Sequence, residues 1–323
     1  MDEPLIWVRA VHFGATMMVT GGVLFLACIA EPAFRSGDDT RVAALVRARL
    51  ATLEWIVLAV TVLSGAAWLV QQAEQMSELS LAAVLSQGIV WTVLSETDFG
   101  YAWMVRLALA GLLAAILPWL GPLRRGRSTR MRAAAVAVSA GLVGTLAWAG
   151  HAAAGSGVEG TIHLAADILH LVAAAAWFGS LIPLVLLLLA ARRDSAEASL
   201  AIARAAVLRF SPLGIVSVGT LVVTGFVNTW VLAGSVPALA GTDYGHLLVI
   251  KVALFLVMLS FGAVNRLWLT PRLEQAPSVP AAAQALRQIV RNSLIEAGLG
   301  TIIIVIVGLL GTLPPGLQDP AIN

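Results

Sequence analysis

The sequence predicts an all-α fold: a polytopic membrane protein with eight transmembrane helices built as two parallel four-helix repeats. The first observation is composition, because 59% of the 323 residues are hydrophobic and only 12% are charged. Soluble domains carry roughly 25% charged residues. The second observation is a series of long apolar segments, and the third is a set of motifs that recurs in both halves of the chain. We therefore expect an integral membrane protein.

Eight apolar segments reach the length of about 20 residues that a helix needs to cross the hydrocarbon core. They cover residues 5–31, 50–71, 99–120, 132–150, 162–190, 210–233, 245–269 and 293–313. The first segment follows MDEPLIW, which lacks the basic residues of a signal peptide, so we expect a permanent span. A ninth apolar stretch, 79–94, is shorter and more polar, and it predicts a short interfacial or re-entrant helix.

The loops predict the orientation of these spans. Basic residues cluster around the loops after the first, third, fifth and seventh spans: Arg35, Arg41, Arg47, Arg49, Arg124, Arg125, Arg127, Arg130, Arg132, Arg192, Arg193, Arg204, Arg209, Arg266, Arg272, Arg287 and Arg291. The alternate loops hold acidic residues and neither arginine nor lysine. The positive-inside rule then places both termini on the periplasmic side. The arginines form no patch interleaved with aromatic residues, so the sequence does not indicate nucleic-acid binding.

Residues 1–150 and 151–323 look like a duplicated unit. The matching stretches are Thr97 to Gly100 with Arg106 against Thr242 to Gly245 with Lys251, Ser64-Gly65 against Thr224-Gly225, and His12 with Gly21 against His170 with Gly179. Four crossings preserve direction, so the two repeats would be parallel. Thr97 and Thr242 also suit helix N-caps.

The segment from His163 to Gly179 reads HLAADILHLVAAAAWFG. It places two histidines and one carboxylate in the first turns of a long apolar run. At 100° per residue, His163, Asp167 and His170 lie within about 60° of one another, and Trp177 shares their face. Ionisable residues in a span indicate a functional site, and imidazole with carboxylate suits a metal ion. A structural alternative remains, in which the histidines bond backbone carbonyls and Asp167 pairs with an arginine. The repeat places Arg9 opposite Asp167 for such a pair.

All five histidines lie toward the predicted outer side. We expect two levels of metal ligands: a mouth of His151, His163 and His246, and a deeper site of His12 and His170, with Asp167 as a further ligand. Softer side chains lie deeper still, at Met17, Met18 and Cys28. We expect the two methionines to be packing residues rather than ligands, and Cys28 to be an inert buried thiol. Imidazole serves copper in both oxidation states, whereas thioether and thiolate favour Cu(I).

Further charged residues interrupt the spans. Arg9, Arg106 and Lys251 lie inside the outer ends of the first, third and seventh spans, where they either snorkel outward or contribute charge to a transport path. Glu54 and Glu296 lie within the inner ends of the second and eighth spans. These two carboxylates either line an exit path or pair with nearby arginines, and we expect the pairing.

Enzyme chemistry is not indicated. The sequence holds no GxSxG, HExxH or phosphate-loop motif, and its single cysteine excludes an internal disulfide. We predict that the protein is not an enzyme, and that any transport runs down a gradient or is coupled to another ion.

The chain resembles the copper resistance protein D family (CopD/PcoD type) over essentially its whole length. The resemblance rests on HxxxDxxH…WFG from His163 to Gly179, RxxH…GG from Arg9 to Gly22, TDYGxLLxxK from Thr242 to Lys251, and Asn265-Arg266. It implies an eight-span inner-membrane protein that moves copper ions, with import from the periplasm as the expected direction. A separate periplasmic copper carrier of the CopC type is the implied partner. The oxidation state of the copper stays open.

Two other interpretations remain at this stage. The first is a membrane redox protein that holds one haem b, with His12 and His170 as axial ligands. The second is a structural or assembly subunit whose buried polar residues only fix helix packing. A visible spectrum and elemental analysis of the purified protein distinguish these interpretations from copper transport.

Overall fold

The computed structural model describes residues 3–35, 41–120, 128–150, 157–194, 196–233 and 240–314. These residues contain helices and turns and no strand. The long helices of the first half are α1 (Glu3–Phe25), α3 (Arg41–Ser77), α6 (Asp98–Ile116) and α7 (Ser128–Gly144). Those of the second half are α8 (Gly157–Asp194), α9 (Glu197–Ala233), α11 (Asp243–Val264) and α13 (Val279–Leu310).

Short elements prolong or connect several of these helices. A π-helix (Leu26–Ala30) and α2 (Glu31–Phe34) continue α1, and 3-10 turns follow α6 and α7 at Leu117–Leu120 and Thr145–Ala149. A second π-helix (Asn265–Leu269) joins α11 to α12 (Thr270–Glu274). Eight of the resulting helical units are long and apolar enough to cross a membrane, which confirms the predicted all-α fold with eight spans.

Several helices extend well beyond the predicted apolar segments. The helix α3 begins at Arg41 and α8 ends at Asp194, because the flanking arginines and alanines are good helix formers and continue the hydrogen-bonded backbone beyond the hydrocarbon. Apolar length therefore locates the spans but not the ends of the helices.

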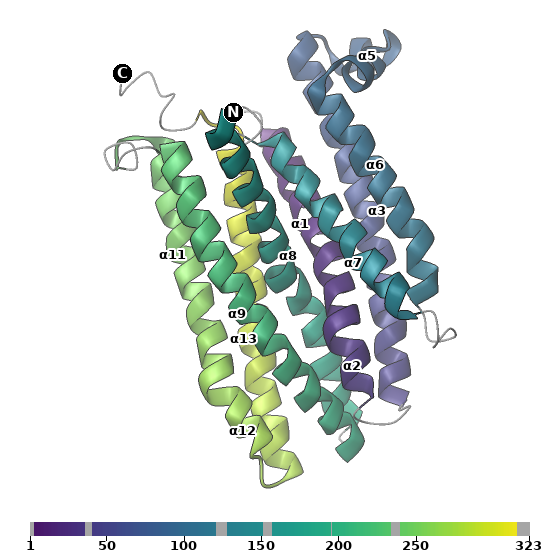
Figure 1. Cartoon of the computed structure of the whole chain (residues 1–323), viewed down its shortest axis with the longest axis vertical. Helices are drawn as coiled ribbons and strands as arrows, with labels where there is room; N and C mark the ends of the chain where they lie inside the picture. The colour runs from purple at the N-terminus through teal and green to yellow at the C-terminus, as the bar shows by residue number, and fades with distance from the viewer. Residues whose placement is uncertain are drawn as a thin grey trace.

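Residues 79–94 form two short helices rather than one: α4 (Leu81–Ser86) and α5 (Ile89–Glu96). They separate at Gly88, which has a φ of 74° and so adopts the left-handed conformation that favours glycine. Trp91 on α5 is 70% exposed. Both helices lie at one end of the bundle, above α3 and α6 in Figure 1, a position that suits an interfacial segment.

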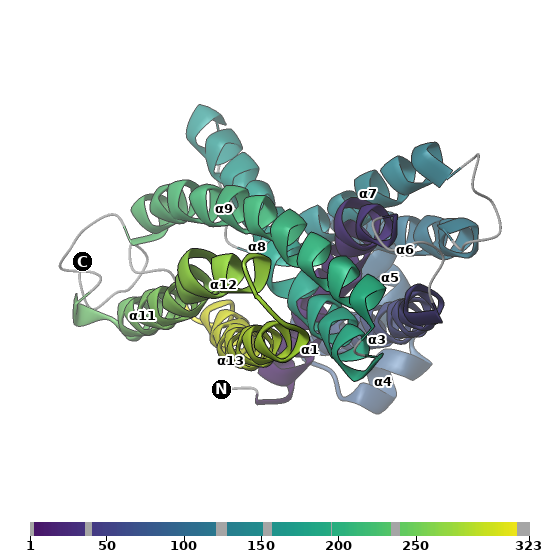
Figure 2. The same cartoon turned by 90° about the horizontal axis from the view of Figure 1, so that it is seen from below.

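The helices α1 and α8 lie at the centre of the bundle. The first half packs its remaining helices α3, α6 and α7 on the α1 side, whereas α9, α11 and α13 lie on the α8 side (Figure 2). We call the end where α1 begins and α13 ends the upper end, as in Figure 1. By the arginine distribution we predict that this upper end faces outward.

Two glycines bring α1 and α8 into backbone contact. A Cβ atom on Gly21 would lie 2.5 Å from the Gly179 Cα atom and 2.5 Å from the Ala175 carbonyl oxygen. The Ser180 hydroxyl donates to the Gly21 carbonyl oxygen at 2.8 Å. Small residues at a helix crossing allow this approach in membrane proteins. The sequence spacing that matches Gly21 with Gly179 thus coincides with a physical contact.

The predicted N-caps are confirmed. The Thr97 and Thr242 side chains accept hydrogen bonds from the backbone N–H groups of Gly100 and Gly245, each at 3.0 Å. Helices α6 and α11 therefore begin in the same way, as two equivalent members of a repeat would. The division into two parallel repeats stays a prediction.

Candidate functional site

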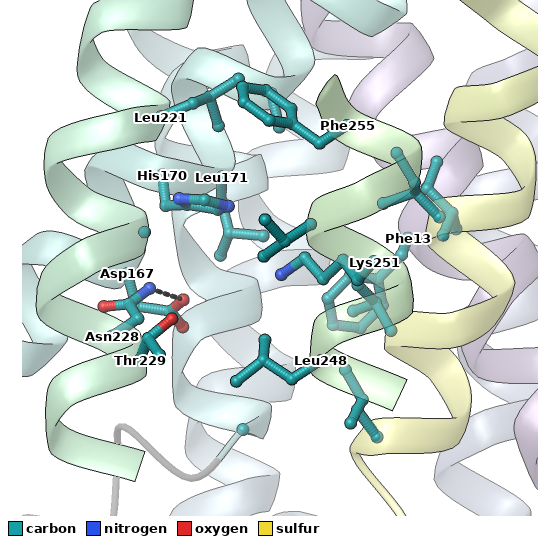
Figure 3. A pocket seen from close by; sticks show the side chains of 18 of the residues that line it. Phe13, Asp167, His170, Leu171, Leu221, Asn228, Thr229, Leu248, Lys251 and Phe255 are labelled. Carbon is teal, nitrogen blue, oxygen red and sulfur yellow. Dashed lines mark hydrogen bonds between the residues drawn. The ribbon is translucent and has the colours of Figure 1, made fainter. Parts of the chain in front are cut away.

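The second half of the chain surrounds a cavity of about 540 Å³. Its walls come from α8, α9, α11 and α13, with α1 contributing residues from the first half. The cavity reaches from Leu310 and Gly311 at the upper end to Trp177 and Gly300 deeper in the bundle. Most of the lining is apolar, so the few polar side chains that face it define its chemistry (Figure 3).

Three polar residues of α8 line this cavity. They are His163, Asp167 and His170, which the helical spacing had predicted on one face. One Asp167 oxygen, Oδ1, accepts a hydrogen bond from Asn228 Nδ2 of α9 at 3.1 Å. The side chain of Lys251 extends from α11 into the same cavity and interacts electrostatically with Asp167 (Figure 3). Lys251 therefore contributes charge to the cavity and does not snorkel outward.

Hydrogen bonding fixes the tautomer of His170. Its Nδ1 atom lies 3.0 Å from the Thr224 hydroxyl oxygen. That hydroxyl already donates its hydrogen to the Thr220 carbonyl oxygen at 2.6 Å, so Nδ1 is the donor and Thr224 the acceptor. The Nε2 atom of the neutral imidazole therefore keeps its lone pair, which is the state a metal ligand needs.

His12 is in a different environment. It is fully buried and does not belong to the cavity lining. Its Nδ1 atom donates to the Thr61 carbonyl oxygen at 3.0 Å, and its ring lies against Trp68 and Trp103 at centroid distances of 5.6 and 6.0 Å. The structure thus does not bring His12 and His170 to one cavity, either as a deeper metal site or as axial ligands of one haem.

Two guanidinium groups lie over the Trp68 ring that packs against His12. Arg9 and Arg106 lie over the Trp68 ring at 4.8 and 5.7 Å, and Arg106 donates to Thr145. Arg106 is 2% exposed, so it does not snorkel. The described residues place no carboxylate within 4 Å of either guanidinium. The positive charge of Arg106, which acts on His12, disfavours a metal cation there at low dielectric.

Arg9 of α1 also lines the cavity. Within the described segments it forms no ion pair with Asp167, which instead has Asn228 and Lys251 as neighbours. Among the described lining residues, a carboxylate and an imidazole are adjacent only on α8, in the second half of the chain.

The remaining predicted residues are spread over the molecule. Met17 and Trp177 line the cavity, whereas Met18 packs in an apolar cluster of the first half and Cys28 is exposed. His246 is exposed and its Nε2 atom lies 2.9 Å from the Ala240 carbonyl oxygen. His151 lies outside the described residues. No three His, Cys, Asp or Glu side chains within the described ranges come close enough to share one metal ion.

The predicted pairing of Glu54 and Glu296 with arginines is wrong. Glu296 accepts a hydrogen bond from Asn265 Nδ2 at 2.8 Å. Glu54 is 3% exposed, and neither of its carboxylate oxygens has a hydrogen-bond partner among the described residues. The arginines remain at the lower end of the bundle, where Arg47 and Arg132 pair with Glu31 instead. Both carboxylates face inward between helices, out of reach of that belt.

Sequence reasoning did not identify Asn228 as a site residue. The available signal was an amide inside an apolar span, one helical turn after Thr224, which the repeat had matched with Ser64. Polar residues within spans mark functional positions by default. Applying that rule to amides as well as to charges would have found Asn228.

The fold and the cavity define a polytopic helical membrane protein with a polar, ionisable site open toward one end of its bundle. The particular family follows from sequence comparison. The profile for the copper resistance protein D-like N-terminal domain matches residues 1–161, and that for copper resistance protein D matches residues 204–310. The chain belongs to the copper resistance protein D family, and it is a copper-related membrane protein.

Two named relatives match nearly the whole chain, and a third matches about half of it. Copper resistance protein D of Pseudomonas syringae pv. tomato is 30% identical and matches 98% of this chain and 99% of its own length. Inner membrane protein YebZ of Escherichia coli strain K12 is 28% identical over 96% of this chain and 98% of its own. Copper transport protein CutJ of Bacillus subtilis strain 168 is 33% identical over 55% of this chain and 32% of its own length.

Proposed function

We propose that this protein moves copper ions across the bacterial inner membrane, with import from the periplasm as the direction. The observation that carries the proposal is the pairing, on one face of α8, of the Asp167 carboxylate with the His170 imidazole inside a cavity. Relatives named for copper resistance and copper transport support the cargo. The predicted outward-facing upper end supports the direction.

The chemistry of the cavity suits a copper ion. Asp167 and His170 are three residues apart on one helix, so their side chains are neighbours, about 5–6 Å apart at Cβ. Thr224 holds His170 in the tautomer that offers Nε2 as a ligand. Imidazole nitrogen binds copper in both oxidation states. His163 lies one turn above Asp167 and lines the same cavity, where it can receive the ion first.

A site with few protein ligands suits transport. Binding must be favourable enough for an ion to enter and weak enough for it to leave. Lys251 also weakens copper binding, because its positive charge faces Asp167, the carboxylate that would bind the copper ion. We propose that copper replaces Lys251 as the electrostatic partner of Asp167. The lipid bilayer and a separate CopC-type periplasmic carrier complete the proposed surroundings.

The proposal is tested by the copper content of the purified protein. Wild-type protein dialysed against copper is expected to retain the metal, and Asp167→Ala and Asp167→Asn are expected to lose most of it. Asparagine keeps the side-chain volume and the Asn228 contact while removing the negative charge. Equal copper content in wild type and both variants, at equal recovery of folded protein, would rule out Asp167 as a ligand.

The support that Thr224 gives to His170 can be tested separately. Thr224→Val preserves side-chain shape but removes the acceptor for His170 Nδ1. Residues that orient a metal-binding histidine typically contribute about 10- to 100-fold in metal affinity. We expect a copper dissociation constant raised by about that factor, measured by competition with a chromophoric chelator. Thr220→Val serves as the control, because its hydroxyl donates only to the Val216 carbonyl oxygen. An unchanged affinity in Thr224→Val would remove this role.

A further inference from the structure

A second polar group lies directly below the cavity. Glu296 of α13 is 1% exposed and receives a hydrogen bond from Asn265 Nδ2 at 2.8 Å. Asn265 Oδ1 in turn accepts a hydrogen bond from Asn292 Nδ2 at 2.9 Å. Asn292 and Glu296 lie one helical turn apart on α13, and Asn265 begins the π-helix that follows α11. These three residues form a connected network in the lower half of the span, and its Asn292 end accepts a hydrogen bond from Arg291 at 3.5 Å.

One side chain contacts both this network and the cavity. Trp177 lines the cavity and is also a hydrogen-bonding neighbour of the Glu296 carboxylate. A Cβ atom placed on Gly262 of α11 would lie 3.5 Å from both Glu296 Oε2 and Trp177 Cζ2. Gly300, one turn above Glu296 on α13, belongs to the cavity lining. A change in the rotamer of Trp177 would therefore join Glu296 to the cavity.

The backbone at this place is irregular. Residues Asn265–Leu269 form a π-helix between α11 and α12, and π-helical insertions inside α-helices frequently occur at functional sites. The insertion lets the Thr270 hydroxyl donate to the Asn265 carbonyl oxygen at 2.8 Å. The residue whose side-chain amide donates to Glu296 thus begins the π-helix.

The Glu296 carboxylate has no positive partner. Its neighbours on α8 and α11 are Trp177 and the π-helix residue Asn265, which are neutral, and no described arginine, lysine or histidine acts on it electrostatically. An isolated negative charge is expensive at this depth. Both amide oxygens accept hydrogen bonds, Asn265 Oδ1 from Asn292 and Asn292 Oδ1 from Arg291 at 3.5 Å. The neutral, protonated carboxyl group is the favourable resting form.

We infer that Glu296 is a proton-binding station below the copper cavity, and that a copper ion moving past Trp177 displaces its proton. The inference rests on the proposed function. In the step, the O–H bond of the Glu296 carboxyl group breaks, the carboxylate compensates the charge of the copper ion, and the proton leaves in the direction opposite to the copper. When the copper has gone, the carboxylate binds a proton again. Copper and proton movement are thereby coupled through one side chain.

Proteoliposomes that enclose a pH-sensitive dye and a copper-sensitive dye test this coupling. When a copper gradient drives the ion into the lumen, wild-type protein is expected to raise the lumenal pH as protons leave. Glu296→Gln is expected to abolish the pH change while purified protein still binds copper at the cavity. Glu54→Gln is the matched control, because Glu54 is an equally buried carboxylate in the first half that does not line the cavity.

The outcomes separate the two proposals. Copper entry without any pH change in wild type, or a pH change that persists in Glu296→Gln, overturns the inference and leaves copper transport standing. No copper entry in wild type sinks the proposed function. Infrared difference spectra then still test whether Glu296 releases a proton. Adding copper to wild type should remove the C=O band of a protonated carboxyl group. This change should be absent in Glu296→Gln and present in Glu54→Gln. If Glu296→Gln does not fold, Glu296→Asp, which keeps a carboxyl group, should show that band at a shifted frequency, and its absence would refute the inference.

Discussion

Replacing His170 with alanine is expected to reduce copper-dependent accumulation to the level of cells that lack the protein. The variant removes the imidazole whose Nε2 lone pair Thr224 presents to the cavity. His163 and Asp167 then remain in the cavity, but the deeper pairing of the carboxylate with the His170 imidazole is lost, and Asp167 keeps Lys251 as its electrostatic neighbour. Cell-associated copper, measured by elemental analysis at equal membrane levels of the protein, gives the result.

Two other histidines sharpen this experiment. His246 is exposed and does not line the cavity, so His246→Ala is expected to keep accumulation near the wild-type level. His12 lies between two tryptophans, and the positive charge of Arg106 acts on it, so His12→Gln is expected to affect stability more than copper. A loss of accumulation in His12→Gln as complete as that in His170→Ala, with normal stability, would show that the first half also binds the ion.

Gly179→Ala is expected to destabilise the whole bundle. Its Cβ atom would collide with the Met17 carbonyl oxygen and lie 3.1 Å from the Gly21 Cα atom, and these atoms belong to the backbone of α1, which cannot rotate away. Separating α1 from α8 loses the close packing on which helix association in lipid depends. Overpacking of this kind costs about 1–3 kcal/mol and occasionally more. Thermal denaturation in detergent, followed by size exclusion, measures the effect.

The matched control is Gly219→Ala on α9. No atom of another element lies within 4 Å of the Cβ atom that alanine would add there. In a helix interior alanine is more favourable than glycine by about 0.8–1.0 kcal/mol, so this variant should be as stable as wild type or more so. Equal denaturation temperatures for Gly179→Ala and Gly219→Ala would contradict the close contact of α1 and α8.

The sequence predicted the helical architecture well because apolar length alone limits what can cross a bilayer. Every predicted span is a helix, and the face shared by His163, Asp167 and His170 follows directly from the helical period. These features are local. They do not depend on how each helix is rotated about its axis or on which helices are its neighbours.

The partners of these residues depended on packing between helices, which local patterns do not contain. His12 and His170 occupy matched positions, and each has a matched hydroxyl beside its Nδ1 atom, that of Ser64 on α3 and that of Thr224 on α9. Only His170 lines the cavity. Sequence matching placed Arg9 opposite Asp167, but the structure gives Asp167 the neighbours Asn228 and Lys251. Equal depth in a membrane does not imply proximity within it.

The same limit explains the error at Glu54 and Glu296. Both carboxylates lie close in sequence to the arginine-bearing ends of their helices, which suggested ion pairs. The helices turn these two side chains toward their neighbours, where Glu296 is held by Asn265 and Glu54 lies against Gly22. The rotation of each helix about its axis determines the partners of these carboxylates, and the spacing of charges along the sequence does not reveal that rotation.

X-ray absorption at the copper edge of the loaded protein tests the central claim most directly. Copper held by Asp167 and His170 should show a first shell of nitrogen and oxygen atoms, with the outer-shell scattering of an imidazole ring. That imidazole pattern should disappear in His170→Ala. A sulfur shell from Met17 or Cys28, or a spectrum that His170→Ala leaves unchanged, would contradict the assignment of the copper site to this cavity.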